Sequence, residues 1–490
     1  MRKRVWRRVT AIVLVAMMFV MCVACGDERD DSEKDAKPTT AQATPTDKPA
    51  KPTEAPVTPT DKPAIPTETP VTPTDKPATP TETPVTPTET PVTPTETPVT
   101  PTGAPTQGTK ELTGSSGTAP VTKAMDDTMR EAYAGFAYKL FDLCSKGTDK
   151  NCLISPFSVY TALAMLANGA DGNTLAQLDN LLGLTGEQRD AYMAAWIDAL
   201  TKQESVDFSC ADSVWVNNLF RENVLPEFLK RCADSYRAEV YAADMDDKTV
   251  DDVNAWTDRN TKGMIKKLLK YGDLNPITTQ MILMNAIAMD AKWQSPFESD
   301  SVNKDATFTH EDGTTSKVEM MYGSADDCYL ENELFTGCTK SYKGGEFRYV
   351  ALLPKEGVSL SEAVASLNRK TIDELFAGAK RDDVDLGIPK YTVEYSVELG
   401  NMLKALGTGD MFSASADLSK LVNTPDSRVD RVIHKTYLAL DNEGTRAAAV
   451  TAVLIKNEAI SMSYRITLDR PFVYMIVDGN NLPLFIGTYR

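Results

Sequence analysis

The chain has 490 residues and a formal net charge of −17, and 20 of its 29 prolines lie before residue 121. An acidic chain is a poor nucleic-acid binder, because such binding depends on lysine and arginine neutralising phosphates. Only two histidines are present, His310 and His434, which excludes a metal centre built from several histidines. The prolines separate a non-globular first part from about 370 residues that can bury one large core.

The N-terminus is typical of an export signal. Residues 1–8 hold five basic side chains, and residues 9–24 are apolar, which is the pattern of a signal peptide. The apolar run is short for a spanning helix, which needs about 20 residues. It ends in Cys22-Val23-Ala24-Cys25, which resembles a bacterial lipobox except that Cys22 stands where leucine is usual. We predict a signal over residues 1–25 with a lipid on Cys25; the alternative is a signal without lipid.

Residues 26–120 are expected to be a disordered tether. Eight tandem heptads rich in proline and threonine, such as TETPVTP, fill residues 46–101. Proline at the fourth and seventh positions blocks both helix and sheet, which favours an extended polyproline II chain. At about 3.1 Å per residue the tether would reach on the order of 300 Å. That length suits a linker that carries a domain through a cell wall.

Residues 121–490 are predicted to form one α+β domain. Helical spacing of apolar residues comes first, and strand-like runs dominate later, which argues against an alternating parallel-sheet fold. The predicted helices are residues 124–144, 158–168, 172–184 and 189–200. The predicted strands are residues 209–217, 280–293, 349–353, 383–395, 429–440, 465–477 and 482–489.

The domain carries no recognised catalytic or metal-binding motif. It lacks a nucleophile elbow, a zinc-helix motif and a Walker A loop. His310 lies in a polar turn pattern, and His434 lies inside a strand pattern, where a core histidine is the favoured interpretation. The acidic stretch 244–252 lacks the glycine and final glutamate of a calcium loop, so we interpret it as a helix start. Neither a metal nor a cofactor is expected.

The domain cysteines have no Cys-x-x-Cys spacing, which argues against a zinc site. Export permits disulfides, but the pairing cannot be deduced from the sequence, so thiols and disulfides both remain open. The six residues are Cys144, Cys152, Cys210, Cys232, Cys328 and Cys338.

Residues 440–455, LDNEGTRAAAVTAVLI, form the most informative segment. Read with a period of two, one face from Thr445 to Ile455 is small or β-branched and uncharged, and Arg446 falls on the other face. Such a segment could insert as a strand into an existing sheet with its first face buried. Insertion could release on the order of 10 kcal/mol if about a dozen residues gain ladder hydrogen bonds. A flexible alanine-rich loop or a plain helix is the alternative.

From about residue 128 to the end, the chain resembles the serpins. Its motifs occur in the family's order: NCLISPFSVYTALAMLANGADGNT at 151–174, then Asn254, Trp256, Thr261, Gly263 and Ile265, then NAIAMDAKWQSPFE at 285–298. IPKY at 388–391, Leu406-Gly407 with Asp410-Met411-Phe412, and His434-Lys435 before the hinge follow. ITLDRPFVYMI at 466–476 fits the serpin signature throughout.

The resemblance implies a fold of three β-sheets with eight or nine helices and an exposed reactive-centre loop. Serpins are mostly single-use inhibitors of serine proteases: the cleaved loop inserts into the main sheet and traps the acyl-enzyme. Gly444 resembles the hinge glycine, and the small hinge residues after it are Thr445, Ala447, Ala448 and Ala449. This intact hinge favours an inhibitor. Asn442 and Arg446 depart from the family's common glutamates, and we expect a change in insertion rate there.

Other matched residues imply mechanical roles. Ser155, Ser158, Asn285 and His434 resemble the polar cluster, or shutter, that holds the main sheet closed. Trp293 resembles the tryptophan of the breach, where the loop enters the sheet.

The family's count from the hinge glycine places the scissile bond at Glu458–Ala459. Met462–Ser463, an elastase-type bait, and Lys456–Asn457, a trypsin-type bait, are alternatives that change the loop length. Glutamate before the bond argues against trypsin-like targets.

The sequence therefore predicts an extracellular serpin, monomeric and bound to the outer face of the cell membrane only through its lipid. Its expected partner is a target serine protease, held as a covalent acyl complex, and no enzymatic activity of its own is expected. The alternative is a non-inhibitory serpin that acts as a surface binding module.

Overall fold

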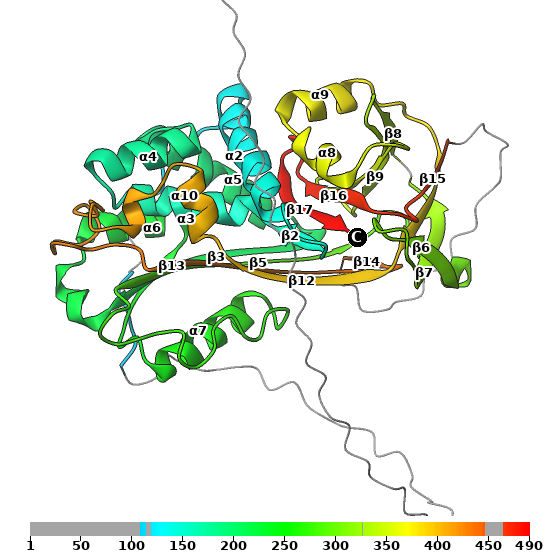
Figure 1. Ribbon diagram of the computed structural model, residues 1–490. Coiled ribbons are helices and arrows are strands. Elements are labelled where there is room, and N and C mark those ends of the chain that lie inside the picture. The colour runs from blue at the N-terminus through cyan, green and yellow to red at the C-terminus, as the bar shows by residue number, and fades with distance from the viewer. Residues whose placement is uncertain (1–107, 114–118, 326, 446–463) are drawn as a thin grey trace, which may run out of the picture. The chain divides into compact units, whose positions relative to one another are not determined.

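The computed structural model of the chain describes residues 108–113, 119–325, 327–445 and 464–490 (Figure 1). These residues contain nine α-helices, α2 to α10, and three β-sheets. The predicted α+β class with three sheets is therefore confirmed.

The helices precede most of the strands, as predicted, and several begin at a capping side chain. Asp126, Ser155 and Asp246 accept hydrogen bonds from the backbone N–H groups of the first turns of α2, α3 and α7. The acidic stretch 244–252 is thus a helix start. The helices are α2 (Asp127–Ser145), α3 (Pro156–Ala167), α4 (Gly172–Leu182), α5 (Gly186–Thr201), α6 (Pro226–Tyr236), α7 (Asp247–Asn260), α8 (Leu360–Ala365), α9 (Arg369–Ala377) and α10 (Gly400–Ala405).

The largest sheet, here called sheet A, has seven strands in the order β1-β4-β3-β5-β14-β13-β12. Its long central strands pair without interruption along β3 and β5, which run antiparallel over eleven positions. The strands are β1 (Lys110–Glu111), β3 (Val206–Asn217), β4 (Glu239–Ala243), β5 (Met281–Lys292), β12 (Tyr391–Glu398), β13 (Arg431–Leu440) and β14 (Gly444–Thr445).

Two smaller sheets complete the fold. Sheet B has the order β2-β17-β16-β10-β9-β8, and sheet C the order β15-β11-β7-β6. The strands of sheet B are β2 (Cys152–Ile154), β8 (Cys328–Glu331), β9 (Phe335–Ser341), β10 (Arg348–Pro354), β16 (Phe472–Val477) and β17 (Pro483–Tyr489). Those of sheet C are β6 (Val302–Thr309), β7 (Thr315–Ser324), β11 (Val384–Pro389) and β15 (Tyr464–Thr467).

Two predicted strands are each divided in the structure. Residues 383–395 form β11 in sheet C and β12 in sheet A, and residues 465–477 form β15 in sheet C and β16 in sheet B. Each run looks continuous in the sequence because both of its halves bury apolar side chains. The chain leaves one sheet and enters another at the break between the halves. His310 lies in the turn between β6 and β7, as predicted, where its N–H donates to Thr314 O.

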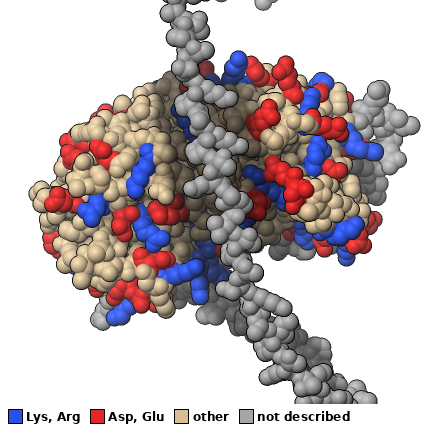
Figure 2. All heavy atoms as spheres, in the orientation of Figure 1, with Lys and Arg blue, Asp and Glu red and all other residues tan. Residues whose placement is uncertain are grey.

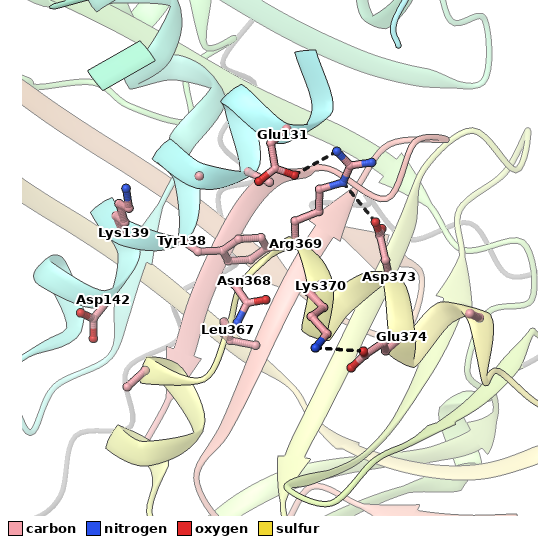
Figure 3. A pocket seen from close by; sticks show the side chains of 14 residues that line it. Glu131, Tyr138, Lys139, Asp142, Leu367, Asn368, Arg369, Lys370, Asp373 and Glu374 are labelled. Carbon is pink, nitrogen blue, oxygen red and sulfur yellow. Dashed lines mark hydrogen bonds and ion pairs between the residues drawn. The ribbon is translucent and has the colours of Figure 1, made fainter. Parts of the chain in front are cut away.

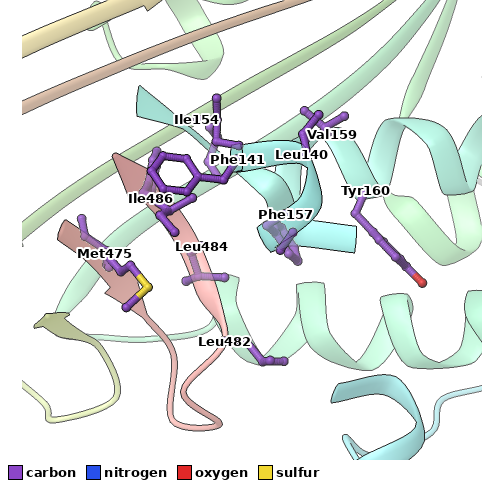
Figure 4. Packing of buried hydrophobic residues seen from close by; sticks show 14 of the residues in the cluster. Leu140, Phe141, Ile154, Phe157, Val159, Tyr160, Met475, Leu482, Leu484 and Ile486 are labelled. Atoms are coloured by element: carbon purple, nitrogen blue, oxygen red, sulfur yellow. The ribbon is translucent and has the colours of Figure 1, made fainter. Parts of the chain in front are cut away.

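Sheet A is covered on one face along its length, and on the other face mainly along β3 and β5, whereas β12 exposes alternate residues there. On one face it packs against α2 to α6 and sheet B, where Phe141, Phe157 and Ile486 belong to a continuous core (Figures 1 and 4). On the other face α7 covers β3 and β5 through a smaller core that includes Trp215 and Trp256. Burial on both sides explains why the strand predicted over residues 280–293 reads as a nearly continuous apolar run.

One described strand lies before residue 121. Lys110 and Glu111, assigned from the sequence to the tether, pair with Ala242 and Tyr241 at the edge of sheet A. The Thr109 hydroxyl also donates to Asp252 at 2.6 Å. The boundary was placed too late because the local sequence has no strand pattern, and the free edge of β4 supplies the pairing partner.

The described surface is mixed in charge. Acidic and basic side chains are interspersed over the face shown in Figure 2. Within the described ranges, none of the helices combines the length and apolar character needed to cross a membrane.

Candidate functional site

A gap in the hydrogen-bond ladder of sheet A forms the centre of the candidate site. β5 and β13 are parallel neighbours, yet they pair directly only where Ile282–Met284 meet Arg431–Ile433. Beyond these positions, residues 285–290 of β5 and 434–439 of β13 have no strand between them among the described residues. On their outer sides β5 is paired with β3, and β13 with β12. These twelve residues line what we call the slot, which can take one further strand.

The short strand β14 closes one end of the slot. It is antiparallel to both neighbours: Thr445 pairs with Leu440 of β13 and with Ala291 of β5. The difference in residue number between Ala291 and Leu440 is the same as that between the directly paired Met284 and Ile433. The two strands therefore keep one register along the slot. A strand that extended β14 would therefore require β5 and β13 to separate sideways, but not to slide along their axes.

Gly444 fits at the end of the slot because it has no side chain. A Cβ atom there would lie 2.1 Å from the Ala291 carbonyl oxygen and 2.8 Å from the Lys292 Cα atom. The preceding turn is held by the Asp441 carboxylate, which accepts from the N–H groups of Glu443 at 2.8 Å and Gly444 at 3.2 Å. The predicted hinge glycine thus stands where the backbones approach too closely for any other residue.

Trp293 and Tyr342 lie beneath Thr445. The hydroxyls of Thr445 and Tyr342 are hydrogen-bonded at 2.5 Å, and the Tyr342 ring stacks on Trp293 with centroids 4.5 Å apart. The Trp293 indole N–H donates to the Asp441 carbonyl at 3.0 Å. The Lys340 ammonium lies 5.7 Å from the Trp293 ring. Trp293 is therefore placed at the end of the slot where β14 begins.

The four predicted shutter residues lie together at the opposite end of the slot. The Ser155 N–H donates to His434 Nε2 at 3.0 Å, and Ser155 Oγ accepts from the Ser158 N–H at 3.2 Å. The Ser158 hydroxyl donates to Asn285 Oδ1. Asn285 and His434 are the first residues beyond the last direct pair of β5 and β13. This polar chain therefore links the N-terminus of α3 to both strands at the point where they separate.

A buried carboxyl that the sequence reasoning missed extends the polar chain. Asn285 Nδ2 donates to Asp212 Oδ1 at 2.6 Å, and Asp212 lies directly opposite Asn285 on β3. Cys210 Sγ lies 3.7 Å from the second carboxylate oxygen, and Asp212 is only 1% exposed. The available signal was an acidic residue in the middle of a predicted strand, a position that rarely carries a charge.

Burial shifts the pKa values of His434 and Asp212 so that both side chains favour their neutral forms. It lowers the pKa of His434 to about 3, so the neutral ring accepts at Nε2 and carries its proton on Nδ1. Burial also raises the pKa of Asp212 to about 7, although hydrogen bonds from Asn285 and Cys210 act in the opposite direction. The centre of sheet A is therefore close to uncharged below neutral pH.

Several predicted site residues lie outside the described residues. These are Cys25, the hinge residues Ala447, Ala448 and Ala449, the bond Glu458–Ala459, and the alternative bonds Met462–Ser463 and Lys456–Asn457. All six domain cysteines are described and are free thiols.

A pocket of about 650 Å³ lies apart from the slot, between α2 and the α8–α9 region (Figure 3). Arg369 on its wall is ion-paired with Glu131 and Asp373, each at 3.1 Å. Lys370 lies 3.7 Å from Glu374. In the part of the chain that the structure describes, no group of histidine, cysteine and acidic residues could hold a metal ion.

Comparison with known proteins identifies the family. The family model for Serpin (serine protease inhibitor) matches residues 131–490. The chain belongs to the serpin family. A serine protease inhibitor from Cyanea capillata is 30% identical over 354 residues, covering 70% of this serpin and 92% of that protein.

Solved structures agree with this assignment. The native state of tengpin, a thermophilic serpin, has a TM-score of 0.71 and 34% identity, covering 78% of this chain and 99% of its own. A thyroxine-binding globulin in complex with thyroxine has a TM-score of 0.66 and 26% identity, covering 74% and 98%. The predicted family and fold are therefore confirmed.

We predict that His434 makes stability depend on pH. Because burial holds its folded pKa near 3, against 6.5 for an ordinary histidine, the stabilisation is complete above pH 6.5 and is lost as the pH falls toward 3. The wild-type advantage over His434→Gln should shrink by about 1.4 kcal/mol per pH unit in this window. Urea unfolding of the two proteins at several pH values measures this difference. An advantage of the wild type over His434→Gln that stays constant with pH would refute the prediction.

Proposed function

We propose that this serpin is a single-use inhibitor of extracellular serine proteases and that the segment after Thr445 is its bait. The observation that supports this most directly is the slot, whose two strands are paired on their outer sides and share one register at both ends. An inhibitor of this type needs a sheet that is complete except for one strand. The relative from Cyanea capillata carries the same activity in its name.

The proposed chemistry is the acylation step of a serine protease, stopped before completion. The protease serine oxygen attacks the carbonyl carbon of Glu458, the bond to the Ala459 nitrogen breaks, and the leaving amine takes up a proton. The new ester joins the protease to the freed end of the bait. Insertion of the bait into the slot then moves the protease and distorts its active site before water can hydrolyse the ester.

The register of β14 predicts where each bait residue would arrive. Continuing from Thr445, Thr451 would come between Asn285 and His434, and Ile455 would lie opposite Met281, the first residue of β5. Thr445 itself is buried and meets the core through Tyr342, so residues of the same parity would face that core. These are the small or β-branched residues of the segment, whose burial requires no charged group to be dehydrated.

The same register indicates at which bait residue insertion would begin to break existing interactions of sheet A. Up to Thr451 the bait would fill the slot without breaking a direct pair between β5 and β13. Past this position the three direct pairs between β5 and β13 must separate, and the hydrogen bonds of Asn285 and His434 must give way. We therefore propose that the polar chain sets a barrier to full insertion, which cleavage of the bait helps to overcome.

The alternative function is a non-inhibitory serpin that binds another molecule at the cell surface. The thyroxine-binding globulin among the structural neighbours supports keeping this alternative, because the same fold there holds a small molecule. An intact glycine and small residues at the hinge favour the inhibitor, because bulky or charged residues would obstruct the slot.

The proposal also includes a site of action. A signal at residues 1–25, a lipid on Cys25 and a tether of proline heptads would hold a monomeric domain outside the cell membrane, where it could protect surface proteins. Recovery of the protein from the cytosolic fraction would contradict this part of the proposal.

The inhibitor is tested by incubating the protein with elastase-like, trypsin-like, subtilisin-like and glutamate-specific proteases. We expect at least one denaturation-resistant complex on a gel, and a released C-terminal peptide that begins at Ala459. A peptide that begins at Ser463 or Asn457 would still support the inhibitor, but would place the scissile bond at Met462–Ser463 or Lys456–Asn457. Clean cleavage by every protease, with no complex, would favour the non-inhibitory alternative.

A second prediction tests the register through a charge pair. Arg446 would arrive opposite Asp290 of β5, which itself lies opposite Asp207 of β3. Asp207 already has Lys262 as an ion-pair partner. An arginine that arrives opposite Asp290 would add a cross-strand pair of opposite charges, which should favour the first step of insertion. We expect Arg446→Glu to slow complex formation several-fold, and Arg446→Glu with Asp290→Lys to restore most of the rate. Stopped-flow measurement of protease inhibition gives these rates, and Lys456→Glu serves as a control charge change. No recovery in the double variant would refute the register.

A further inference from the structure

The polar chain ends at the buried carboxyl of Asp212. The surroundings of this carboxyl favour its protonated, neutral form. Its Oδ1 atom accepts from the Asn285 amide, which in turn accepts from Ser158. Among the described residues no lysine or arginine forms an ion pair with it. A carboxylate without a cationic partner is costly to bury, whereas the protonated acid keeps the same hydrogen bond.

The other titratable groups around Asp212 cannot compensate for its charge. They are Cys210 on the same strand, Cys232 on α6 with Asp190 beside it, and His434 at the far end of the polar chain. Burial raises the pKa of both thiols well above the usual range and lowers that of His434. Near neutral pH all three are therefore uncharged, and Asp190 has its own ion-pair partner in Arg231 at 3.9 Å.

Asp212 lies one strand away from the slot. It is paired with Asn285, the first residue of β5 beyond the direct pairs with β13, so opening of the sheet at this position removes the cover over Asn285. Opening at this position would bring water to the Asn285 side chain, which is hydrogen-bonded directly to the carboxyl. An ionised Asp212 would gain hydration in the open sheet that the closed sheet denies it.

We propose that Asp212 is a pH-sensitive brake on the opening of sheet A: as a neutral acid it keeps the slot closed, and as a carboxylate it favours strand insertion. This inference deepens the proposed function, since it concerns the step that the bait must complete. It makes the inhibitor slower to insert a strand in mildly acidic surroundings and faster at neutral or alkaline pH. The burial-raised pKa of about 7 places the change in the range where an exported protein works.

The test measures strand uptake without any protease. The full chain is mixed with a fluorescent peptide that carries the sequence of residues 445–456, and the rate of uptake is followed from pH 6 to pH 9. Because His434 stays neutral over this range, we expect uptake to be about tenfold faster at pH 8 than at pH 6 and level above pH 8. Asp212→Asn keeps the shape and the acceptor oxygen, and its rate should not change with pH.

A matched control is Asp478→Asn. Asp478 is another buried acid with a raised pKa, but it binds Trp196 between β16 and β17, away from the slot. This variant should keep the wild-type profile. The brake is refuted if wild-type uptake is independent of pH, or if Asp212→Asn retains the wild-type dependence. Failure to take up the peptide at any pH would refute the slot itself, and with it the proposed function.

A direct titration covers the case in which Asp212→Asn does not fold. Infrared spectra of the Asp478→Asn protein should show a buried protonated carboxyl that ionises with a midpoint near pH 7. A midpoint near that of an ordinary aspartate would overturn the proposal.

Discussion

Backbone groups in a buried strand must find hydrogen-bond partners, and the two strands that line the slot find them on one side only. Along the slot β5 and β13 are paired with their outer neighbours, yet residues 285–290 and 434–439 are paired with no described strand on the sides that face each other. β5 is buried along nearly its whole length, so its free energy is lowest when its ladder is complete on both sides. The rest of the account follows from this gap, because it gives the segment after Thr445 a place of lower free energy.

The gap is closed at both ends by few interactions. At one end β14 contributes two residues, and the close approach of Gly444 to Ala291 leaves no room for a side chain. At the other end three direct pairs and one polar chain hold β5, β13 and α3 together. Each interaction contributes on the order of 1 kcal/mol, so small changes in this region should alter insertion rates strongly. The buried carboxyl of Asp212 adds a dependence on protons to the same region.

Much of the fold could be predicted from the sequence because its motifs are local. The Ser155-Pro156 start of α3, the apolar run of β5 and the hinge around Gly444 are all visible in short segments. The meeting of Ser155, Asn285 and His434 was inferred from family resemblance and not from spacing, since these residues are far apart in the chain. Asp212 was missed although an acid in the middle of a predicted strand is unusual, because the local sequence does not show which side chains that acid meets. The strand of residues 110–111 was missed because its conformation is set by the edge of β4.

The central claim is that sheet A lacks one strand, which the chain itself can supply. It is tested most directly by cleaving the segment after Thr445 with a protease and comparing the urea resistance of the cleaved and intact chains. If the freed segment enters the slot, the cleaved chain should be more stable by on the order of 10 kcal/mol, and its unfolding should shift to much higher urea. Equal or lower urea resistance after cleavage would contradict the account.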